Sequence, residues 1–574
     1  MNATFSNTLP ARPGSLDWLW RELAPSHDRK VRTLILISGA VLCVIISMAL
    51  QVPELAVSAY MIFFISKETK TVTTIVGVLG LVGLTMGVAV SLLLYQLTYG
   101  HPELRIPSMA IVLFLGMYLS RALVLGPLAF LLGFVIAVTQ SIGDLLPSPE
   151  LLVRAILWLW VAIAYAVVLT VVLNRLFLPQ PAGPPRHPPK PKSLFVPDAF
   201  TNPAHVRFAL KVTLAAMFCY VFYSAVDWFG IHTAFITCVF ISLESTGHTL
   251  HKGVLRAGGC LIGGLLALLS IIFLIPHMET IASLAVLVAC VSVIAGWVAT
   301  GTERIAYAGL QIAFAFFYGL FPGFQGFAPS TDLHEVRDRV AGILLGLMVT
   351  ALVFHFIWPE RAMDRLRDIL RQVLRQLAGL LVIPRPETPV NEAKSQAAVS
   401  AAEILKELDQ ARREAELTGF EIDAPQPRER VSLDCLETIL SQAERVLALA
   451  TSLTSDSAWR EWQQLPLDVQ TVESKLRNAI ARCVERAGNG DSAENTDANL
   501  STALARWTET IRQLSLESSR ITLVSRIAAE VQHFGRNYQE PAPLKEHQRR
   551  SGFEPERLVA VAKELLGKNR RSHE

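Results

Sequence analysis

The chain has 574 residues, of which 52% are hydrophobic and 18% are charged. This composition is too apolar for a soluble protein of such length and indicates a membrane protein with several spans. The formal net charge of +3 is too small to indicate a nucleic-acid partner. The seven cysteines show no C-x-x-C spacing, so we expect neither disulfides nor a metal or other cofactor.

Residues 1–31 are polar and predict a cytoplasmic N-terminal segment, because the first apolar run is too long for the core of a secretory signal. Two groups of six apolar segments follow. The first group lies near 32–50, 53–66, 72–95, 107–119, 122–140 and 151–177, and the second near 205–226, 230–243, 253–275, 280–299, 304–321 and 337–358. Between the groups, the prolines from Pro179 to Pro197 predict an extended cytoplasmic linker over 179–204.

Short sequence matches relate the two groups at offsets of 175 to 183 residues. The matched pairs are Val31-Arg32 with Val206-Arg207, Ile65-Ser66-Lys67-Glu68 with Ile241-Ser242-Leu243-Glu244, Ser120-Arg121-Ala122 with Glu303-Arg304-Ile305, and Val153-Arg154 with Val336-Arg337. Four matches in chain order predict two copies of one transmembrane module, over 32–178 and 205–359.

The second segment of each module is short. About 14 helical residues rise roughly 21 Å, whereas the apolar core of a bilayer is about 30 Å thick. Short spans in corresponding positions are typical of a transport pathway. The alternative is that Leu50 and Phe229 belong to these helices and lengthen them.

Basic residues predict the orientation. If the N-terminus is cytoplasmic, Lys67, Lys70, Lys252 and Arg256 lie inside. The turns that would then lie outside, near 51–54, 141–150, 227–230 and 276–280, carry no Lys or Arg. We therefore expect both termini to be cytoplasmic and the two modules to run parallel.

Beyond Pro359 the composition becomes charged, and Leu366, Leu370, Val373 and Leu377 recur at helical spacing. This pattern predicts a helical cytoplasmic domain over 360–574. The domain shows no phosphate-binding loop, kinase motif or metal-ligand spacing, so we expect that the protein is not an enzyme. The predicted fold is thus all-α, with two parallel six-helix transmembrane repeats and a C-terminal helical domain.

Four titratable residues are candidates for proton coupling. Asp227 and His232 flank Gly230 at the outer mouth of the second module's short hairpin, and His titrates near neutral pH. Glu303 and Asp338 stand at the beginnings of later spans. The alternative is that these groups sit at membrane edges, where charge costs little, and only end helices or line wet turns.

Four basic residues are candidates for a substrate path. Lys211 lies inside the seventh span, and Arg304 and Arg337 begin the eleventh and twelfth. Arg154 occupies the place that matches Arg337, without an adjacent acid, and an uncompensated Arg would suit a carboxylate. Snorkelling to the interface and neutralisation by neighbouring acids are the alternatives.

Several motifs resemble one known family. They are Pro197-Asp198-Ala199-Phe200-Thr201-Asn202-Pro203, Val226-Asp227-Trp228-Phe229-Gly230-Ile231-His232-Thr233, Thr302-Glu303-Arg304, Glu335-Val336-Arg337-Asp338-Arg339 and Trp358-Pro359-Glu360. With them the chain resembles the fusaric acid resistance (FUSC) family, which overlaps the aromatic acid exporters. The likeness covers about 1–360 and is strongest in the second module. The family usually has a long insert between its modules, where this chain has only the proline-rich linker.

The resemblance implies export of aromatic acids or other toxic compounds from a bacterial inner membrane, with a periplasmic adaptor protein and an outer-membrane channel as partners. We also expect a lipid bilayer around the protein, a homo-oligomer and no nucleic acid. Because no ATP site is visible, a proton gradient would drive export. The alternatives are a passive organic-anion channel and a non-transporting scaffold.

Overall fold

The computed structural model describes residues 20, 22–144, 148–179, 193–243, 245–321, 329, 331–382, 390–418, 427–489, 494–514 and 518–532. Within these ranges the chain is helical, and its one pair of bridged extended residues is Leu123 with Phe195. Two compact units divide it: Met1–Glu244 with Thr249–Trp358, and Ser245–His248 with Pro359–Glu574. The polar residues 1–19, most of the proline-rich linker and Glu244 lie outside the described residues.

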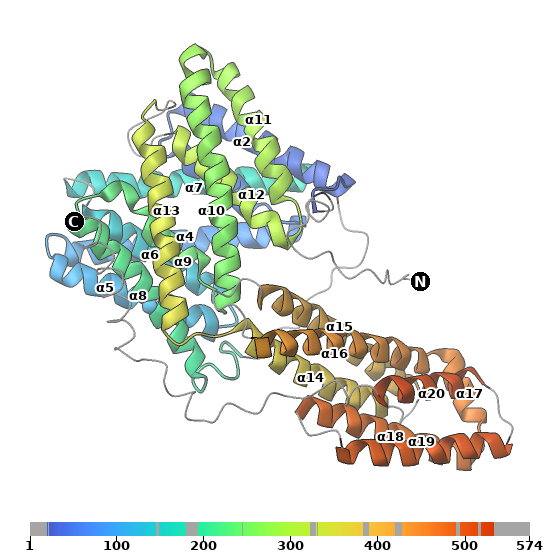
Figure 1. Cartoon of the computed structure of the whole chain (residues 1–574). Helices are drawn as coiled ribbons and strands as arrows, with labels where there is room; N and C mark the ends of the chain where they lie inside the picture. Colours follow the sequence, from blue (N-terminus) through green and yellow to red (C-terminus); the bar gives the residue numbers. More distant parts are fainter. Residues whose placement is uncertain are drawn as a thin grey trace, which may run out of the picture. The chain divides into compact units, whose positions relative to one another are not determined.

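The first unit contains two successive sets of six α-helices (Figure 1). The first set is α2 (His27–Leu50), α3 (Leu55–Ile65), α4 (Lys70–Thr98), α5 (Pro102–Ala122), α6 (Gly126–Ser141) and α7 (Pro149–Phe177). The second set is α8 (Pro203–Ala225), α9 (Thr233–Ile241), α10 (Thr246–Leu269), α11 (Ile281–Ala299), α12 (Glu303–Leu320) and α13 (Leu333–Phe356). A 3-10 turn, Phe229–Ile231, precedes α9, and a π-helical turn, Ser270–Leu274, extends α10.

Eight helices of the described residues are long and apolar enough to span a bilayer, namely α2, α4, α5, α7, α8, α10 with its extension, α11 and α13. Shorter apolar helices are α3, α6 and the segment Phe229–Ile241. Helix α12 is not among these candidates, and Glu303, Arg304 and Gln311 lie within its 18 residues. The prediction of an all-helical, polytopic membrane protein is confirmed.

Several helices begin earlier than the sequence predicted, α5 and α10 among them. The fourth segment was expected to begin at 107, but α5 begins at Pro102 and keeps Pro107 inside it. Proline at the first helical position costs nothing, since the N–H it lacks has no acceptor in the first turn. The ninth segment, expected from 253, begins at Thr246, because its polar first two turns are helical although they are not apolar.

The second helix of each set is short. Leu50 ends α2 and Phe229 begins the 3-10 turn, so neither residue lengthens the following α-helix. The two short helices, α3 and α9, have 11 and 9 residues. An α-helix of 11 residues rises only about 17 Å.

The turns before α3 and α9 share one conformation. Gln51 and Asp227 both adopt left-handed backbone angles, with φ of 52° and 54°. In each turn the next residue donates a hydrogen bond to the carbonyl five residues back: Val52 N to Ser47 O and Trp228 N to Tyr223 O, both at 2.9 Å. This is the Schellman arrangement that satisfies carbonyls at a helix end.

The turns after α3 and α9 also match. Thr73 Oγ1 accepts a hydrogen bond from Lys67 N at 2.9 Å, and Thr249 Oγ1 accepts one from Leu243 N at 3.0 Å. Each hydroxyl also donates to the carbonyl of the same residue, at 3.5 and 3.3 Å. A threonine thus closes both hairpins at the same place.

Helix packing follows the same correspondence. Helix α2 packs against α11, and its counterpart α8 packs against α5. Helix α3 packs against α12, while Phe240 of α9 contacts Phe130 and Phe134 of α6 through its ring edge. Helix α3 therefore packs on a helix of the other set, and α9 contacts one through Phe240.

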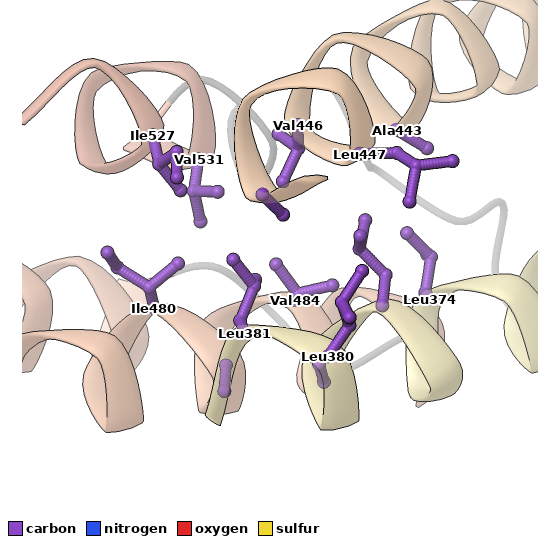
Figure 2. Packing of buried hydrophobic residues seen from close by; sticks show 14 of the residues in the cluster. Leu374, Leu380, Leu381, Ala443, Val446, Leu447, Ile480, Val484, Ile527 and Val531 are labelled. Carbon is purple, nitrogen blue, oxygen red and sulfur yellow. The ribbon is translucent and has the colours of Figure 1, made fainter. Parts of the chain in front are cut away.

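The second unit is a helical bundle (Figure 1). Its helices are α14 (Ala362–Val382), α15 (Val390–Leu417), α16 (Pro427–Leu453), α17 (Asp456–Gln464), α18 (Leu467–Asn489), α19 (Glu494–Leu514) and α20 (Ser519–Gln532). Figure 2 shows its core, where Leu374 of α14 lies opposite Leu447 of α16, and where Leu381 of α14, Val446 of α16, Val484 of α18 and Val531 of α20 gather beside them. The periodic leucines of α14 noted in the sequence are buried, with Leu366 only 1% exposed.

Candidate functional site

One face of α12 carries a stripe of aromatic and polar side chains. The stripe consists of Tyr307, Gln311, Phe314 and Tyr318, spaced four, three and four residues apart. Residues at this spacing lie along one side of a helix. The stripe extends over roughly 16 Å, at about 1.5 Å per residue.

Three cations lie over three rings of this stripe. Lys252 Nζ is 4.9 Å from the Tyr307 ring centroid, Arg256 Cζ is 5.4 Å from that of Phe314, and Arg339 Cζ is 4.4 Å from that of Tyr318. A cation within about 6 Å of a ring face is attracted by the ring quadrupole. We call these six side chains the cation–ring row.

Two helices supply the cations. Lys252 and Arg256 are four residues apart on α10 and therefore share one face, whereas Arg339 comes from α13. Gly259 and Gly263 bring α10 onto α12, since a Cβ at Gly259 would lie 2.5 Å from Ala308 O and one at Gly263 would collide with Ile312 O. Small residues at such positions let helix backbones approach closely.

Arg256, in the middle of the row, is only 2% exposed. Its Nε donates to Thr237 Oγ1 of α9 at 3.2 Å. Its Nη1 donates to Gln311 Oε1 at 2.7 Å and to the Tyr307 hydroxyl at 3.3 Å. The guanidinium thus joins α9, α10 and α12.

At the other end of the row, Arg339 interacts electrostatically with Glu54, Glu335 and Tyr318. We call these four residues the Glu54–Arg339 cluster. Glu54 is 5% exposed, and its Oε1 has no hydrogen-bond partner among the described residues, which also holds for Glu335 Oε2. Glu54 precedes α3 with a left-handed φ of 62°. Buried carboxyl oxygens without partners are rare and mark functional groups or bound water.

Aromatic contacts connect the two short helices with the row. Tyr60 of α3 meets Phe314 edge-on, with ring centroids 5.1 Å apart. Phe64 of α3 meets Phe240 of α9 edge-on at 6.3 Å. The cation–ring row therefore stands where α3 and α9 come together.

Of the four proton-coupling candidates from the sequence, Asp227, His232 and Asp338 adjoin the turn before α9, and Glu303 begins α12. Asp227 is exposed at its turn, and Glu303 is exposed at the beginning of α12. Asp338 is half-buried against Gly230 and pairs with Arg337 at 2.8 Å. His232 is half-buried, with Nδ1 3.0 Å from Phe229 O, and interacts electrostatically with Arg339. His232 thus interacts with the Glu54–Arg339 cluster, and Asp338 directly precedes Arg339 in the chain.

The four substrate-path candidates lie on four different helices, α7, α8, α12 and α13. Arg154 was expected to lack a compensating acid, and this is wrong, since Glu150, one helical turn earlier, pairs with it at 3.0 Å. Arg304 pairs with Glu22 at 3.6 Å, and Arg337 lies over the Trp228 ring. Lys211 is 1% exposed, donates to Trp358 O at 3.2 Å and lies over Phe354.

Sequence reasoning assigned no functional role to Glu54, Lys252, Arg256 or Arg339. Lys252 and Arg256 entered it only as charges that set orientation, and Arg339 only as part of a family motif. Two signals were present: the i, i+4 pair Lys252 and Arg256 inside an apolar helix, and the helical spacing from Tyr307 to Tyr318. Among the described residues, no three His, Cys, Asp or Glu side chains converge to hold a metal ion.

Comparison with known proteins agrees with this architecture. Residues 214–354, from α8 to α13, match the family model of fusaric acid resistance protein-like domains. Lys252, Arg256 and Arg339 lie within the matched segment, and Glu54 lies before it.

The chain is also similar to multidrug resistance protein MdtO. It is 33% identical to MdtO of Shigella flexneri over 331 residues, which is 57% of this chain and 45% of that protein. It is 32% identical to MdtO of Escherichia coli O157:H7 and of strain K12, over 57% of this chain and 44% of each relative. The chain thus spans less than half the length of these relatives. The resemblance to the fusaric acid resistance family is confirmed, and the chain is similar to proteins of the MdtO type.

Proposed function

We propose that this protein is a membrane efflux transporter that exports organic anions, such as aromatic acids, or other toxic compounds. The observation that carries the proposal is the cation–ring row beside two short helices. Its cations attract a negative charge, and its rings offer flat apolar surfaces to an aromatic body. Nothing in this arrangement points to bond-breaking chemistry, so the proposed role is transport and not catalysis.

We propose that the two helix sets are parallel repeats of one transmembrane module, over 32–178 and 205–359. The matched turns around α3 and α9 and the exchanged packing partners support this. In this proposal, residues 1–31, the linker 179–204 and the helical domain 360–574 are cytoplasmic, and so are both termini.

The proposed energy source is the proton gradient. Glu54 is the main candidate for the proton carrier, because it is buried, has no hydrogen bond at Oε1 among the described residues and interacts electrostatically with Arg339. An acid beside a cation can exchange a proton for an anion that binds the same cation. His232 and Asp338 adjoin this region and stay candidates. Asp227 and Glu303 are exposed, so a coupling role for them rests on the sequence alone.

The proposed setting is a bacterial inner membrane, where a homo-oligomer of this chain would work with a periplasmic adaptor protein and an outer-membrane channel. The names of the relatives, multidrug resistance proteins, support a resistance role. The family resemblance supports the tripartite assembly.

Purified protein in proteoliposomes tests the function. With an imposed pH gradient, the wild type is expected to accumulate labelled benzoate against its concentration gradient. Glu54→Gln keeps the size of the side chain and cannot carry the proton, so uphill accumulation is expected to fall to the level of empty vesicles while downhill exchange of benzoate persists. Asp227→Asn, at an exposed position, is the comparison.

Full uphill transport by Glu54→Gln would remove Glu54 from coupling, and loss of uphill transport in Asp227→Asn alone would return that role to Asp227. The second candidate function is a passive organic-anion channel, which the three aligned cations also favour. Downhill benzoate current without uphill accumulation in the wild type would establish the channel and exclude the exporter.

A further inference from the structure

The guanidinium of Arg256 has one amino group without a partner. Nε and Nη1 are hydrogen-bonded to Thr237, Gln311 and Tyr307, whereas Nη2 has no acceptor among the described residues although it is buried. A buried donor attached to a charged group costs free energy when it stays unpaired. The three hydrogen bonds fix the plane of the guanidinium, so the direction in which Nη2 points is fixed too.

The charge of Arg256 is also uncompensated. In the part of the chain that the structure describes, no carboxylate lies within ion-pair distance of Arg256 or of Lys252, one helical turn earlier. The two cations interact unfavourably with each other. Burying two adjacent cations in an apolar surrounding costs free energy unless an anion binds beside them. An anion that accepts a hydrogen bond would therefore both compensate the charge of Arg256 and pair with its Nη2 donor.

The fold keeps Arg256 in this position. Gly259 and Gly263, one and two turns after Arg256, allow α10 to lie close against α12. Thr237 of α9 accepts a hydrogen bond from the Arg256 guanidinium. Phe314 lies under one face of the guanidinium, so the edge with Nη2 is the side that is left for a ligand to bind. Lys252 is half-buried, nearer the beginning of α10, and offers a first contact on the way in.

We infer that Arg256 Nη2, with Lys252 beside it, forms a binding site for a singly charged oxyanion, with Phe314 and Tyr307 as the adjoining rings. The oxyanion is the carboxylate of a small acid or the phosphate of a lipid headgroup. One open amino group and one neighbouring ammonium match one anionic group. As the binding point of the transport path, the site rests on the proposed function, yet binding to it can be measured without transport.

Equilibrium binding to the full-length protein in detergent tests the site, with benzoate as the carboxylate probe and benzamide as its uncharged analogue. Wild-type protein is expected to bind benzoate and not benzamide. Arg256→Gln is expected to weaken benzoate binding by about tenfold or more, because a charge-assisted hydrogen bond is lost. Arg256→Lys, which keeps the charge without the fork, is expected to lie between the two. Arg175→Gln, on the exposed side of α7, is the matched control and is expected to bind as the wild type does.

Lys252→Gln is the second variant, in case Arg256→Gln does not fold as judged by its thermal unfolding. It is expected to weaken benzoate binding severalfold, since Lys252 contributes charge and no fixed hydrogen bond. Phosphatidylglycerol distinguishes the two sources of oxyanion: if it binds in an Arg256-dependent way and benzoate does not, the site is real and its ligand is a lipid phosphate.

Benzoate or phosphatidylglycerol binding that is equal in wild type, Arg256→Gln and Lys252→Gln would overturn the site, as would equal binding of benzamide and benzoate. Arg256-dependent binding without uphill transport would keep the site and remove the exporter. Uphill transport with Arg256-independent binding would do the reverse.

Discussion

At the scale of single residues, a carboxylate in the second unit stabilises the fold, and this role can be measured separately from transport. Glu461 of α17 accepts a hydrogen bond from Ser519 Oγ at 2.7 Å and one from the Arg520 N–H at 3.0 Å. Both donors belong to the first turn of α20, where backbone N–H groups lack helical partners. Glu461 therefore holds the beginning of α20. The hydrogen bond from Ser519, followed by the one from Arg520, lowers the pKa of Glu461 below its ordinary value.

Glu461→Gln is expected to destabilise the second unit by about 0.5–2 kcal/mol at pH 7, as the loss of a helix cap does. A carboxyl whose pKa is lower in the folded state stabilises it above the unfolded pKa, and this contribution disappears as the pH falls through the folded pKa. The difference in unfolding free energy between wild type and Glu461→Gln should therefore shrink on acidification from pH 7 to below about 4. Urea unfolding at several pH values measures it.

Glu509→Gln is the control, since Glu509 pairs with exposed Arg512 and accepts a hydrogen bond from Gln513, both on its own helix. Its cost should stay below about 0.5 kcal/mol at neutral pH. A pH-independent cost of Glu461→Gln would show that charge has no part in the cap.

At the scale of helices, the contact between α10 and α12 depends on glycine. The two glycines that face α12, Gly259 and Gly263, leave no room for a side chain, whereas a Cβ at Gly258 meets nothing within 4 Å. The cation–ring row exists because these two backbones lie so close. A larger residue at the contact must push α10 away and carry Arg256 with it.

Gly263→Val is expected to destabilise the membrane unit by about 1–3 kcal/mol, as overpacking does. Gly258→Val makes the same chemical change on the open face of the same helix, so it should leave the stability nearly unchanged. Thermal unfolding of the two purified variants in one detergent measures the difference. Equal midpoints would mean that α10 and α12 do not pack through Gly263.

At the scale of the whole membrane unit, the two helix sets share a framework and differ in charge. When the two sets are aligned on the matched threonines Thr73 and Thr249, the positions of Lys252 and Arg256 correspond to Val76 and Gly80 of α4. The first set thus has the hairpin and lacks the two cations. In the proposed repeat, only the second copy carries the inferred anion site.

Thr73→Val and Thr249→Val test the equivalence of the two sets. Each removes a hydroxyl that hydrogen-bonds to both backbone groups of one residue, and should cost about 1–3 kcal/mol because a buried N–H loses its acceptor. Thr73→Ser and Thr249→Ser keep the hydroxyl and should restore most of the stability. Thermal unfolding measures all four variants, and a loss confined to one threonine would contradict equivalent hairpins.

The sequence by itself determined the number and order of the apolar helices, because spans in lipid must be long, apolar and internally hydrogen-bonded. The sequence also predicts the correspondence between the hairpins, since short matches such as Ile65-Ser66-Lys67-Glu68 are local. The family resemblance was likewise readable from linear motifs such as Val226 to Thr233.

Only the tertiary structure decided which charges meet. Glu54 and Arg339 are 285 positions apart in the chain. No local sequence pattern indicates that these two residues interact. Arg154 looked uncompensated in a comparison with Arg337, and its partner, Glu150, is one helical turn away on the same helix. The choice of Asp227 and Glu303 rested on residue type, whereas burial depends on which helix faces pack together. The composition of a helix determines whether it lies in the membrane. The partners of a buried charge depend instead on the distances between helices. Those distances depend on the size of the residues at the helix contacts, such as Gly259 and Gly263, which have no side chain.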